Sequence, residues 1–320
     1  MKRSERVKWR DLHGIVLLDK PMGVTSSQAL QSVRRLFRAA KGGHTGALDP
    51  LATGLLPLCF GEATKLASSL LGSRKAYLAE CRLGITTDTA DREGEVVRQR
   101  PVPPLDDAMI ETALAKLRGR ILQVPPMYSA LKRDGERLYA KARRGETVEV
   151  APREVDVHQL TLLSRVGDTL QLLVECGSGT YVRSLAADLG EDLGCGAHLT
   201  ALRRTWVEPF REPHMATLEQ VQQAAEKSDD ALLSLLLPIS AGLSDIPAVQ
   251  LDETQSMAIA RGQPIQLAAS LPAGRCAAFA NDGALLALLE LDARRQTRIL
   301  RGFNLPPDDD LCLKPASLLL

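Results

Sequence analysis

The sequence lacks long apolar runs and the short motifs of common nucleotide-binding and hydrolytic sites. Its most apolar stretch, residues 231–239, follows Asp229-Asp230, contains Pro238 and is far shorter than the roughly 20 residues that span a bilayer. GxxxxGK[ST], GxSxG, HExxH and DxDxDG are all missing, and no GxGxxG leads from an expected strand into a helix. These absences argue against a membrane protein, a phosphate-loop protein and a serine or zinc hydrolase.

Cysteine pairs with metal-binding spacing are missing too. The six cysteines are Cys59, Cys81, Cys176, Cys195, Cys276 and Cys312. They are scattered through mostly apolar segments, which favours buried thiols over disulfides. Cys195 and His198 lie three residues apart but lack further ligands, so we expect no metal. Asp19 and Lys20 interrupt the only candidate for a signal peptide, so the sequence predicts a cytoplasmic protein without a membrane anchor.

A charge excess of either sign is also absent, because 40 Lys and Arg oppose 39 Asp and Glu. The cations are nevertheless grouped. An N-terminal cluster holds Lys2, Arg3, Arg6, Lys8 and Arg10, a second cluster holds Arg34, Arg35, Arg38 and Lys41, and a third holds Lys132, Arg133, Arg137, Lys141, Arg143 and Arg144. Such clusters are usually solvated faces, but three of them in a neutral chain leave room for a polyanion track.

What the sequence does contain is a glycine-rich segment around one carboxylate, GHTGALDPLATG at residues 43–54. Gly43, Gly46 and Gly54 permit positive φ, and Pro50 keeps Asp49 out of the α region. A lone Asp-Pro usually only hydrogen-bonds its own turn. The density of special backbone residues here indicates a tight polar loop that holds Asp49 as a fixed group.

The elements around this loop can be read from periodicity. Residues 15–18 and 55–60 are apolar and strand-like, and residues 63–71 are expected to be helical up to Gly72. Thr25 and Gln28 form a capping box for a helix whose apolar face holds Leu30, Val33 and Phe37. In the strand predicted from Tyr77 to Leu83, alternate residues share one apolar face. Tyr77 opens that strand, where an ordinary tyrosine packs at the edge of a core.

Later segments complete a mixed pattern of helices and strands. Residues 88–94 are a polar turn, 106–117 a helix, 170–176 a strand, and 199–206 a short strand. Pro125-Pro126 and Gly145 bound a basic stretch that we expect to project as an arm. Runs at residues 276–279, 285–289 and 299–301 predict a small all-β module. Arg183 lies in the first turn of a helix that ends at Gly194, where a cation opposes the helix dipole unless an anion pairs with it.

Long segments of this chain resemble the bacterial TruB-type tRNA pseudouridine-55 synthases. The matching segments are GIVLLDKPMGVTS from Gly14, GHTGALDPLATGLLP from Gly43, KAY from Lys75, LG from Leu83, TDT from Thr87, PPMYSALK from Pro125, GTYVRSLAADLG from Gly179 and GAHLTALRR from Gly196. The resemblance implies an α+β pseudouridine-synthase fold, with a mixed, largely antiparallel sheet flanked by helices. It implies a catalytic domain at 1–240, an inserted RNA-gripping arm at about 124–152, and a PUA-like β domain at 247–314.

The resemblance also implies roles for individual residues. Asp49 matches the aspartate that attacks the target uridine, Tyr77 matches the tyrosine that stacks on the flipped base and handles a proton, and Arg183 matches the arginine paired with the aspartate. The substrate-binding residues carried over are His44, Tyr77, Tyr181, Leu202 and Lys20. The family uses neither metal nor organic cofactor, and its partner is the T arm of tRNA. The resemblance thus implies a cytoplasmic isomerase that makes pseudouridine at position 55, and we expect a monomer.

Elementary chemistry agrees with this implication. An enzyme that exchanges an N-glycosidic for a C-glycosidic bond must reach a base in a stacked loop, so it needs cations for the phosphates, an aromatic ring and one nucleophile. A non-catalytic RNA-binding or tRNA-folding protein is the alternative, and the combination of Asp49, Tyr77 and Arg183 argues against that as the only role. A metal-dependent hydrolase using His44 and Asp49 lacks further ligands.

Overall fold

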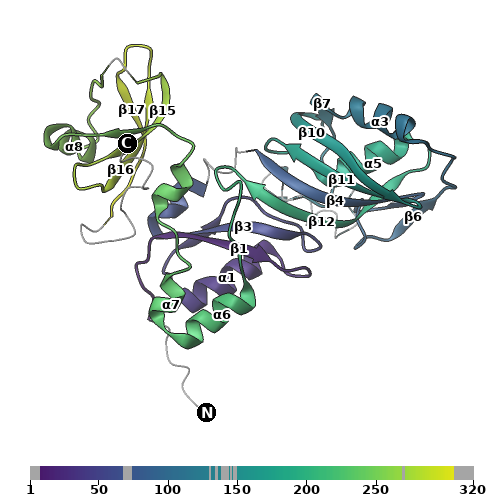
Figure 1. Ribbon diagram of the computed structural model, residues 1–320, viewed down its shortest axis with the longest axis horizontal. Coiled ribbons are helices and arrows are strands. Elements are labelled where there is room, and N and C mark those ends of the chain that lie inside the picture. The colour runs from purple at the N-terminus through teal and green to yellow at the C-terminus, as the bar shows by residue number, and fades with distance from the viewer. Residues whose placement is uncertain are drawn as a thin grey trace.

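A computed structural model describes residues 8–67, 74–129, 131–133, 136–137, 144, 146, 150–268 and 271–305. Figure 1 shows a long curved sheet with helices packed against it and a smaller β module beyond one end. No helix in the described part of the chain is long and apolar enough to cross a membrane.

The main sheet has nine strands and is mostly antiparallel. Eight of them run in the order β13 (Ala216–Thr217), β1 (Gly14–Lys20), β3 (Thr53–Phe60), β12 (Ala197–Val207), β4 (Lys75–Leu83), β11 (Thr169–Cys176), β10 (Arg153–Val166) and β7 (Gly119–Gln123). The ninth, β2 (Gly42–His44), pairs with β3. Among the described strands of this sheet, only the pairs β1–β13 and β3–β12 are parallel. The mixed, largely antiparallel sheet expected from the sequence is therefore confirmed.

Helices cover one face of this sheet. They are α1 (Ser26–Phe37), α3 (Asp107–Lys116), α5 (Val182–Asp192), α6 (Leu218–Lys227) and α7 (Asp229–Leu233). Figure 1 places α1, α6 and α7 together beside β1 and β3, and α3 and α5 at the other end. Residues of α1, α3, α5 and α6 bury their apolar faces in one core with the strands. The predicted capping box at Thr25 is present, with Gln28 bonding back to the cap.

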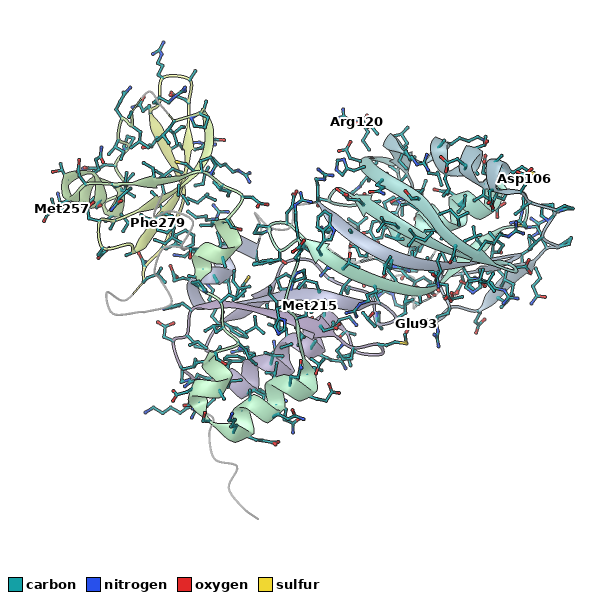
Figure 2. The ribbon with its side chains drawn as sticks, in the orientation of Figure 1. Glu93, Asp106, Arg120, Met215, Met257 and Phe279 are labelled. Carbon is teal, nitrogen blue, oxygen red and sulfur yellow. The ribbon has the colours of Figure 1, made fainter. Side chains whose placement is uncertain are left out.

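Strand β1 is apolar on both faces because both faces are covered. Val16 and Leu18 belong to the helix-side core, whereas Ile15 and Leu17 belong to a second core. That second core joins the sheet to the C-terminal module through residues such as Phe279 and to η2 (Ile239–Leu243). Figure 2 labels Phe279 in the module. A strand buried on both sides reads as an apolar run rather than an alternating one, and this explains the sequence GIVLL.

The C-terminal module is a four-stranded sheet in the order β14 (Ala248–Gln250), β15 (Gly274–Phe279), β16 (Leu285–Leu291) and β17 (Thr297–Gly302). The three runs predicted as strands form β15 to β17. The module also contains a helix, α8 (Glu253–Ala260), capped by Asp252, which the sequence analysis did not predict. Leu251, Ile259 and Leu289 lie in its own small core.

The remaining predictions are confirmed in part. Residues 61–66 form a 3₁₀ helix, η1, and residues 68–73, including the predicted stop at Gly72, lie outside the described residues. A hairpin of β5 (Ile85–Thr87) and β6 (Val96–Gln99) encloses the predicted turn at 88–94. Within the expected arm, β8 (Lys132–Arg133) and β9 (Glu136–Arg137) pair, while most of residues 134–149 lie outside the described residues.

Candidate active site

Asp49 lies on the loop between β2 and β3. Gly46 and Gly54 adopt φ of 117° and 96°, as expected, whereas Gly43 belongs to β2 and keeps a negative φ. A Cβ at Gly54 would stand 2.2 Å from the carbonyl oxygen of Arg204, so the close approach of β3 and β12 requires glycine. The start of β3, just after the Asp49 loop, thus lies tightly against β12.

Two buried polar side chains fix this loop. The Ser26 hydroxyl donates to the Leu48 carbonyl at 3.0 Å and accepts from the Leu48 amide at 2.8 Å. Lys20 is fully buried, and its ammonium donates to the carbonyl oxygens of Pro21, Val24 and Pro50. Burial lowers the pKa of Lys20 to about 8, although the Asp49 carboxylate favours the charged form. Lys20 therefore holds the backbone at Pro50, directly after Asp49.

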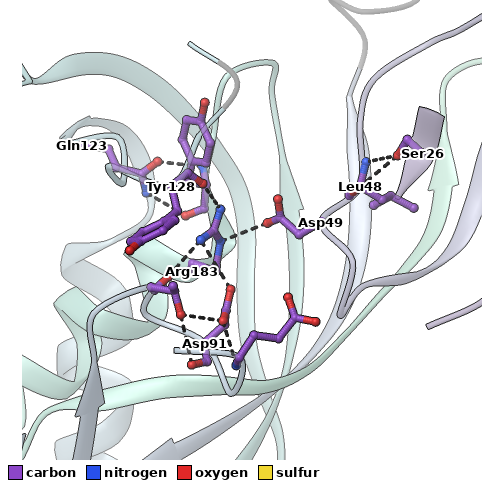
Figure 3. Close-up of polar contacts among 10 residues, drawn as sticks. Ser26, Leu48, Asp49, Asp91, Gln123, Tyr128 and Arg183 are labelled. Carbon is purple, nitrogen blue, oxygen red and sulfur yellow. Dashed lines mark hydrogen bonds and ion pairs between the residues drawn. The ribbon is translucent and has the colours of Figure 1, made fainter. Parts of the chain in front are cut away.

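Arg183 connects three separate segments at the mouth of the site. It is 3% exposed, and its Nε lies 2.9 Å from Asp49 Oδ2 while Nη1 lies 3.4 Å from Asp91 Oδ2. The guanidinium also donates to the carbonyl oxygens of Thr89 and Tyr128, at 2.9 and 2.8 Å. Figure 3 shows Arg183 between Asp49, Asp91 and Tyr128. The anion that the helix position of Arg183 led us to expect is thus present twice.

The charge state of Asp49 is set by opposing effects. Burial raises the pKa of the Asp49 carboxyl, the Arg183 guanidinium lowers it, and the Asp91 carboxylate raises it further. The side chain is still 40% exposed, so a substrate can reach it. A carboxylate that is paired with Arg183 on one side and exposed on the other suits a nucleophile or a base.

Tyr77 and Leu202 form the inner wall of a cleft of about 280 Å³ that opens beside Asp49. They come from neighbouring antiparallel strands, β4 and β12, and both are more than nine-tenths buried. Burial raises the pKa of Tyr77, while the adjacent Arg204 lowers it. The cleft is lined by Gly46, Ala47, Leu48, Asp49, Lys75, Tyr77, Ser129, Ser178, Gly179, Thr180, Tyr181, Val182, Arg183, Leu202 and Arg204.

Tyr181 caps the N-terminal end of α5 on the other side of the cleft. Its backbone amide donates to Gln123 Oε1 at 2.7 Å, and its carbonyl accepts from Gln123 Nε2 at 3.1 Å. The Ser184 hydroxyl adds a bond of 3.0 Å to the Val124 carbonyl. The end of β7 therefore fixes the start of the helix that carries Arg183. Burial raises the pKa of the Tyr181 phenol.

His44 lies at the end of β2 and not among the residues that line the cleft. Burial and the Arg204 charge lower the pKa of His44, which favours a neutral imidazole. Its Nδ1 is buried and has no hydrogen-bond partner among the described residues. The structure thus brings Asp49, Tyr77, Tyr181, Arg183 and Leu202 together, and leaves Lys20 and His44 just outside the lining.

Sequence reasoning missed three residues of the site. Asp91 was read as part of a polar turn, yet it is 3% exposed and contacts Arg183. Arg204 was given no role within the segment GAHLTALRR, although it alternates with Leu202 and so points into the cleft. Gln123 could not be predicted, because its side chain bonds the backbone of Tyr181, far away in the sequence, and no local sequence pattern marks such a contact.

The cysteines and acidic residues show no metal-binding arrangement in the described ranges. No group of three or more His, Cys, Asp or Glu side chains gathers there. Cys59, Cys81, Cys176, Cys195 and Cys276 are buried free thiols, as predicted, and Cys312 lies outside the described residues. Burial raises the pKa of the Cys59 thiol to about 12, which makes it unreactive.

The basic clusters differ in how many of their charges are already paired. Arg10 and Arg38 both contact Asp229, and Arg34 bonds the carbonyl oxygens of Ala39 and Ala40 while stacking on Trp9. Arg35 and Lys41 are exposed, and neither forms an ion pair within the described chain. In the third cluster, Arg144 contacts Glu136 and Glu146, and the side chains at positions 132, 133 and 137 to 143 lie outside the described residues.

Two family models match this chain. The model described as "TruB family pseudouridylate synthase (N terminal domain)" covers residues 34–182. The model described as "tRNA pseudouridylate synthase B C-terminal domain" covers residues 183–244. The boundary between the two matches falls at the start of α5, next to Arg183.

Curated relatives match over almost their whole length. The chain is 57% identical over 302 residues to tRNA pseudouridine synthase B of Xanthomonas campestris pv. campestris (strain B100), covering 93% of this chain and 97% of the relative. It is 54% identical over 300 residues to tRNA pseudouridine synthase B of Xylella fastidiosa (strain Temecula1 / ATCC 700964), covering 94% and 99%. A chain in the crystal structure of a Cbf5-Nop10-Gar1 complex superposes with a TM-score of 0.71 at 23% identity, covering 91% of this chain and 85% of that chain, which supports the fold.

Proposed function

This chain belongs to the TruB family of pseudouridylate synthases and isomerises uridine to pseudouridine in tRNA, and we propose that it acts on a T-loop uridine, at position 55, with Asp49 as the nucleophile. The observation that supports this role for Asp49 is its ion pair with the buried Arg183 at the mouth of the cleft. Arg183 favours the ionised carboxylate, and ionisation is what a nucleophile needs.

In the proposed reaction, the target uridine leaves its stack and enters the cleft. The Asp49 carboxylate attacks it and the N-glycosidic bond breaks. The freed uracil turns and rejoins the ribose through C5, while the bond formed by Asp49 breaks and the carboxylate is regenerated. The product carries hydrogen on N1 and none on C5, so one proton is removed from carbon and one is gained by nitrogen. Tyr77 offers a hydroxyl within the cleft for this transfer and a ring on which the base stacks.

The other site residues have binding roles in this proposal. Tyr181 and Leu202 line the pocket for the uracil ring. His44, with its lowered pKa, contacts the RNA as a neutral imidazole where the base leaves the loop. Lys20 acts from behind by holding the Pro50 carbonyl, so that the Asp49 loop keeps its shape when the base enters.

We further propose how the rest of the molecule serves this site. Residues 1–240 form the catalytic domain, the arm at about 124–152 grips the RNA, and residues 247–314 form a PUA-like domain. The enzyme acts as a cytoplasmic monomer without metal or organic cofactor. A mechanism by Asp49 attack and proton transfer needs no oxidant, reductant or Lewis acid, and this is why we propose that no metal or cofactor takes part.

The deciding experiment is incubation with unmodified tRNA in EDTA, followed by mapping of pseudouridine through its selective chemical adduct. We expect one modified position, in the T loop, for the wild-type chain and none for Asp49→Asn. Asp19→Asn is the matched control, because Asp19 contacts Arg203 away from the cleft lining. Asp49→Asn should keep its tRNA affinity; appreciable turnover by this variant would remove Asp49 from the mechanism.

The same experiment tests the alternative function. Tight tRNA binding by a wild-type chain that forms no pseudouridine, with or without EDTA, would support a non-catalytic RNA-binding or tRNA-folding protein. Modification at a different tRNA position would keep the isomerase but contradict the assignment to the T loop.

A further inference from the structure

Arg204 is a fully buried cation for which the proposed reaction has so far no use. It is 1% exposed and lies on β12, directly opposite Tyr77 on β4 and Gly54 on β3. Its Nε donates to the Leu55 carbonyl at 2.7 Å, and its Nη2 donates to the Gly46 carbonyl at 3.2 Å. The guanidinium is thus fixed at the junction of three strands and bonded to the loop that carries Asp49.

The environment of Arg204 contrasts with that of Arg183. Arg183 contacts two carboxylates, whereas Arg204 makes no ion pair with a carboxylate in the described ranges. A buried charge without a counter-charge is costly unless polar groups solvate it. Two carbonyl oxygens provide part of that solvation, and Tyr77, which lies directly across the strand pair and lines the same cleft, is the polar side chain next to the guanidinium.

Tyr77 meets charged or titratable groups from each neighbouring element. Arg204 faces it from β12, Cys176 from β11, and Asp49 from the loop before β3, while Lys75 lines the same cleft from its own strand. Asp49 and a thiolate at Cys176 would oppose negative charge on the phenol oxygen. Arg204 is the cation that lies opposite Tyr77 across the two strands, and its field also reaches His44 and Lys75.

We propose that Arg204 is a positioning residue for the isomerisation, which holds the Tyr77 oxygen in the cleft and stabilises its phenolate form. This inference rests on the proposed function. The Tyr77 phenol gives its proton to N1, directly or through water, and the phenolate that forms is stabilised by Arg204. The phenolate oxygen then accepts the proton from C5 as the C5–H bond breaks, and the electron pair of that bond stays in the ring, so the phenol is restored and the reaction balances.

The first test needs no RNA. Fluorotyrosine incorporation gives a ¹⁹F signal for each tyrosine, Tyr77→Phe identifies the signal from position 77, and the signal is followed against pH. We expect Arg204→Met to move this titration to higher pH and Arg204→Lys to move it less. An unchanged titration in both variants would overturn the proposal. Arg203→Met is the matched control, since Arg203 points the other way and contacts Asp19.

The second test is single-turnover pseudouridine formation in saturating tRNA. We expect Arg204→Met to lower the rate by about 10²-fold, as loss of a preorganised charge does elsewhere, with partial rescue in Arg204→Lys. In a Tyr77→Phe background the same change should cost much less, because the oxygen it serves is gone. Equal losses in both backgrounds would contradict action through Tyr77 and indicate a role in the loop instead.

Stability and function are separated by these measurements. If Arg204→Met fails to fold, Arg204→Lys still carries both tests, because it keeps the charge and changes its geometry. If the wild-type chain makes no pseudouridine, the proposed function fails, while the ¹⁹F titration still decides whether Arg204 stabilises the Tyr77 phenolate.

Discussion

Tyr77 supplies a ring and a hydroxyl at one point of the cleft, and substitutions separate the two. If Tyr77 only packs at the edge of the core, Tyr77→Phe leaves stability and turnover unchanged, because the ring remains. With the hydroxyl in proton transfer, we expect a loss of about 10²-fold or more in single-turnover rate, with unchanged melting temperature and tRNA affinity. A Tyr77→Phe enzyme as fast as the wild type would leave stacking as the only role.

The Arg183 ion pair predicts a change in pH dependence. The Asp49 carboxylate must be ionised to attack, so turnover falls as the pH drops through the pKa of Asp49. Arg183 lowers that pKa against the effect of burial, so its removal in Arg183→Gln raises the pKa and moves the acid limb of the rate profile to higher pH. Arg203→Gln is the control, because its partner Asp19 is not part of the cleft. An acid limb at the wild-type pH, together with weaker tRNA binding, would mean that Arg183 contacts a phosphate.

Some of the site residues could be predicted from the sequence and others could not, for a physical reason. Asp49 stood out because its loop needs glycine and proline at particular positions, and Arg183 because a cation at a helix start is unfavourable alone. The TruB resemblance supplied Tyr77. Asp91 and Gln123 act across long sequence separations, on Arg183 and on the Tyr181 backbone, and no local pattern records such a contact. Arg204 could have been found from its alternation with Leu202.

At the scale of elements, the start of α1 is what holds the Asp49 loop in place. Ser26 both donates to and accepts from the backbone of Leu48, so Ser26→Ala leaves two buried backbone groups unpaired. We expect a loss of about 1–3 kcal/mol in the free energy of unfolding, and a loss of turnover greater than the loss of tRNA affinity. Ser27→Ala, at an exposed position one residue further on, is the control. Denaturant unfolding and single-turnover rates check both variants. Identical behaviour of the two would show that the Asp49 loop keeps its conformation without the Ser26 hydrogen bonds.

Elements were predictable where their own periodicity was strong. The helices α1 and α3 have caps and an apolar face, and β4 alternates, so each was found within a residue or two. β10, the longest strand among the described residues, was missed because its alternation at Val155 and Val157 is interrupted by register shifts at Val157–Gln159 and Leu162–Ser164. α8 was missed because its short sequence has little amphipathic pattern and depends on the Asp252 cap.

At the scale of the whole molecule, the paired and unpaired cations predict where RNA binding is electrostatic. Arg35 and Lys41 are exposed without an ion pair in the described chain, whereas Arg38 is held by Asp229. We expect log K for tRNA to fall linearly with log salt, and the double change Arg35→Glu and Lys41→Glu to reduce the slope by about 2, one for each phosphate contact. Arg298→Glu in β17 is the control, since Arg298 contacts Glu290 in the C-terminal module. An unchanged slope in the α1 variant would place the RNA on another face.

The C-terminal module and the catalytic sheet share one apolar core, and this predicts that they unfold together. Phe279 is 2% exposed and packs in the cluster that contains Ile15, Leu17 and Leu55 from β1 and β3. Phe279→Ala should cost about 3–5 kcal/mol, and it should lower the melting temperature reported by the catalytic domain as well as by the module. Ile259→Ala is the control, because Ile259 belongs to the separate core inside the module. Differential scanning calorimetry gives the overall transition, and the fluorescence of Trp206 in β12 reports on the catalytic sheet. Together they distinguish the outcomes. A Phe279→Ala chain with an unchanged Trp206 transition would mean that the module contributes nothing to the stability of the sheet that carries the active site.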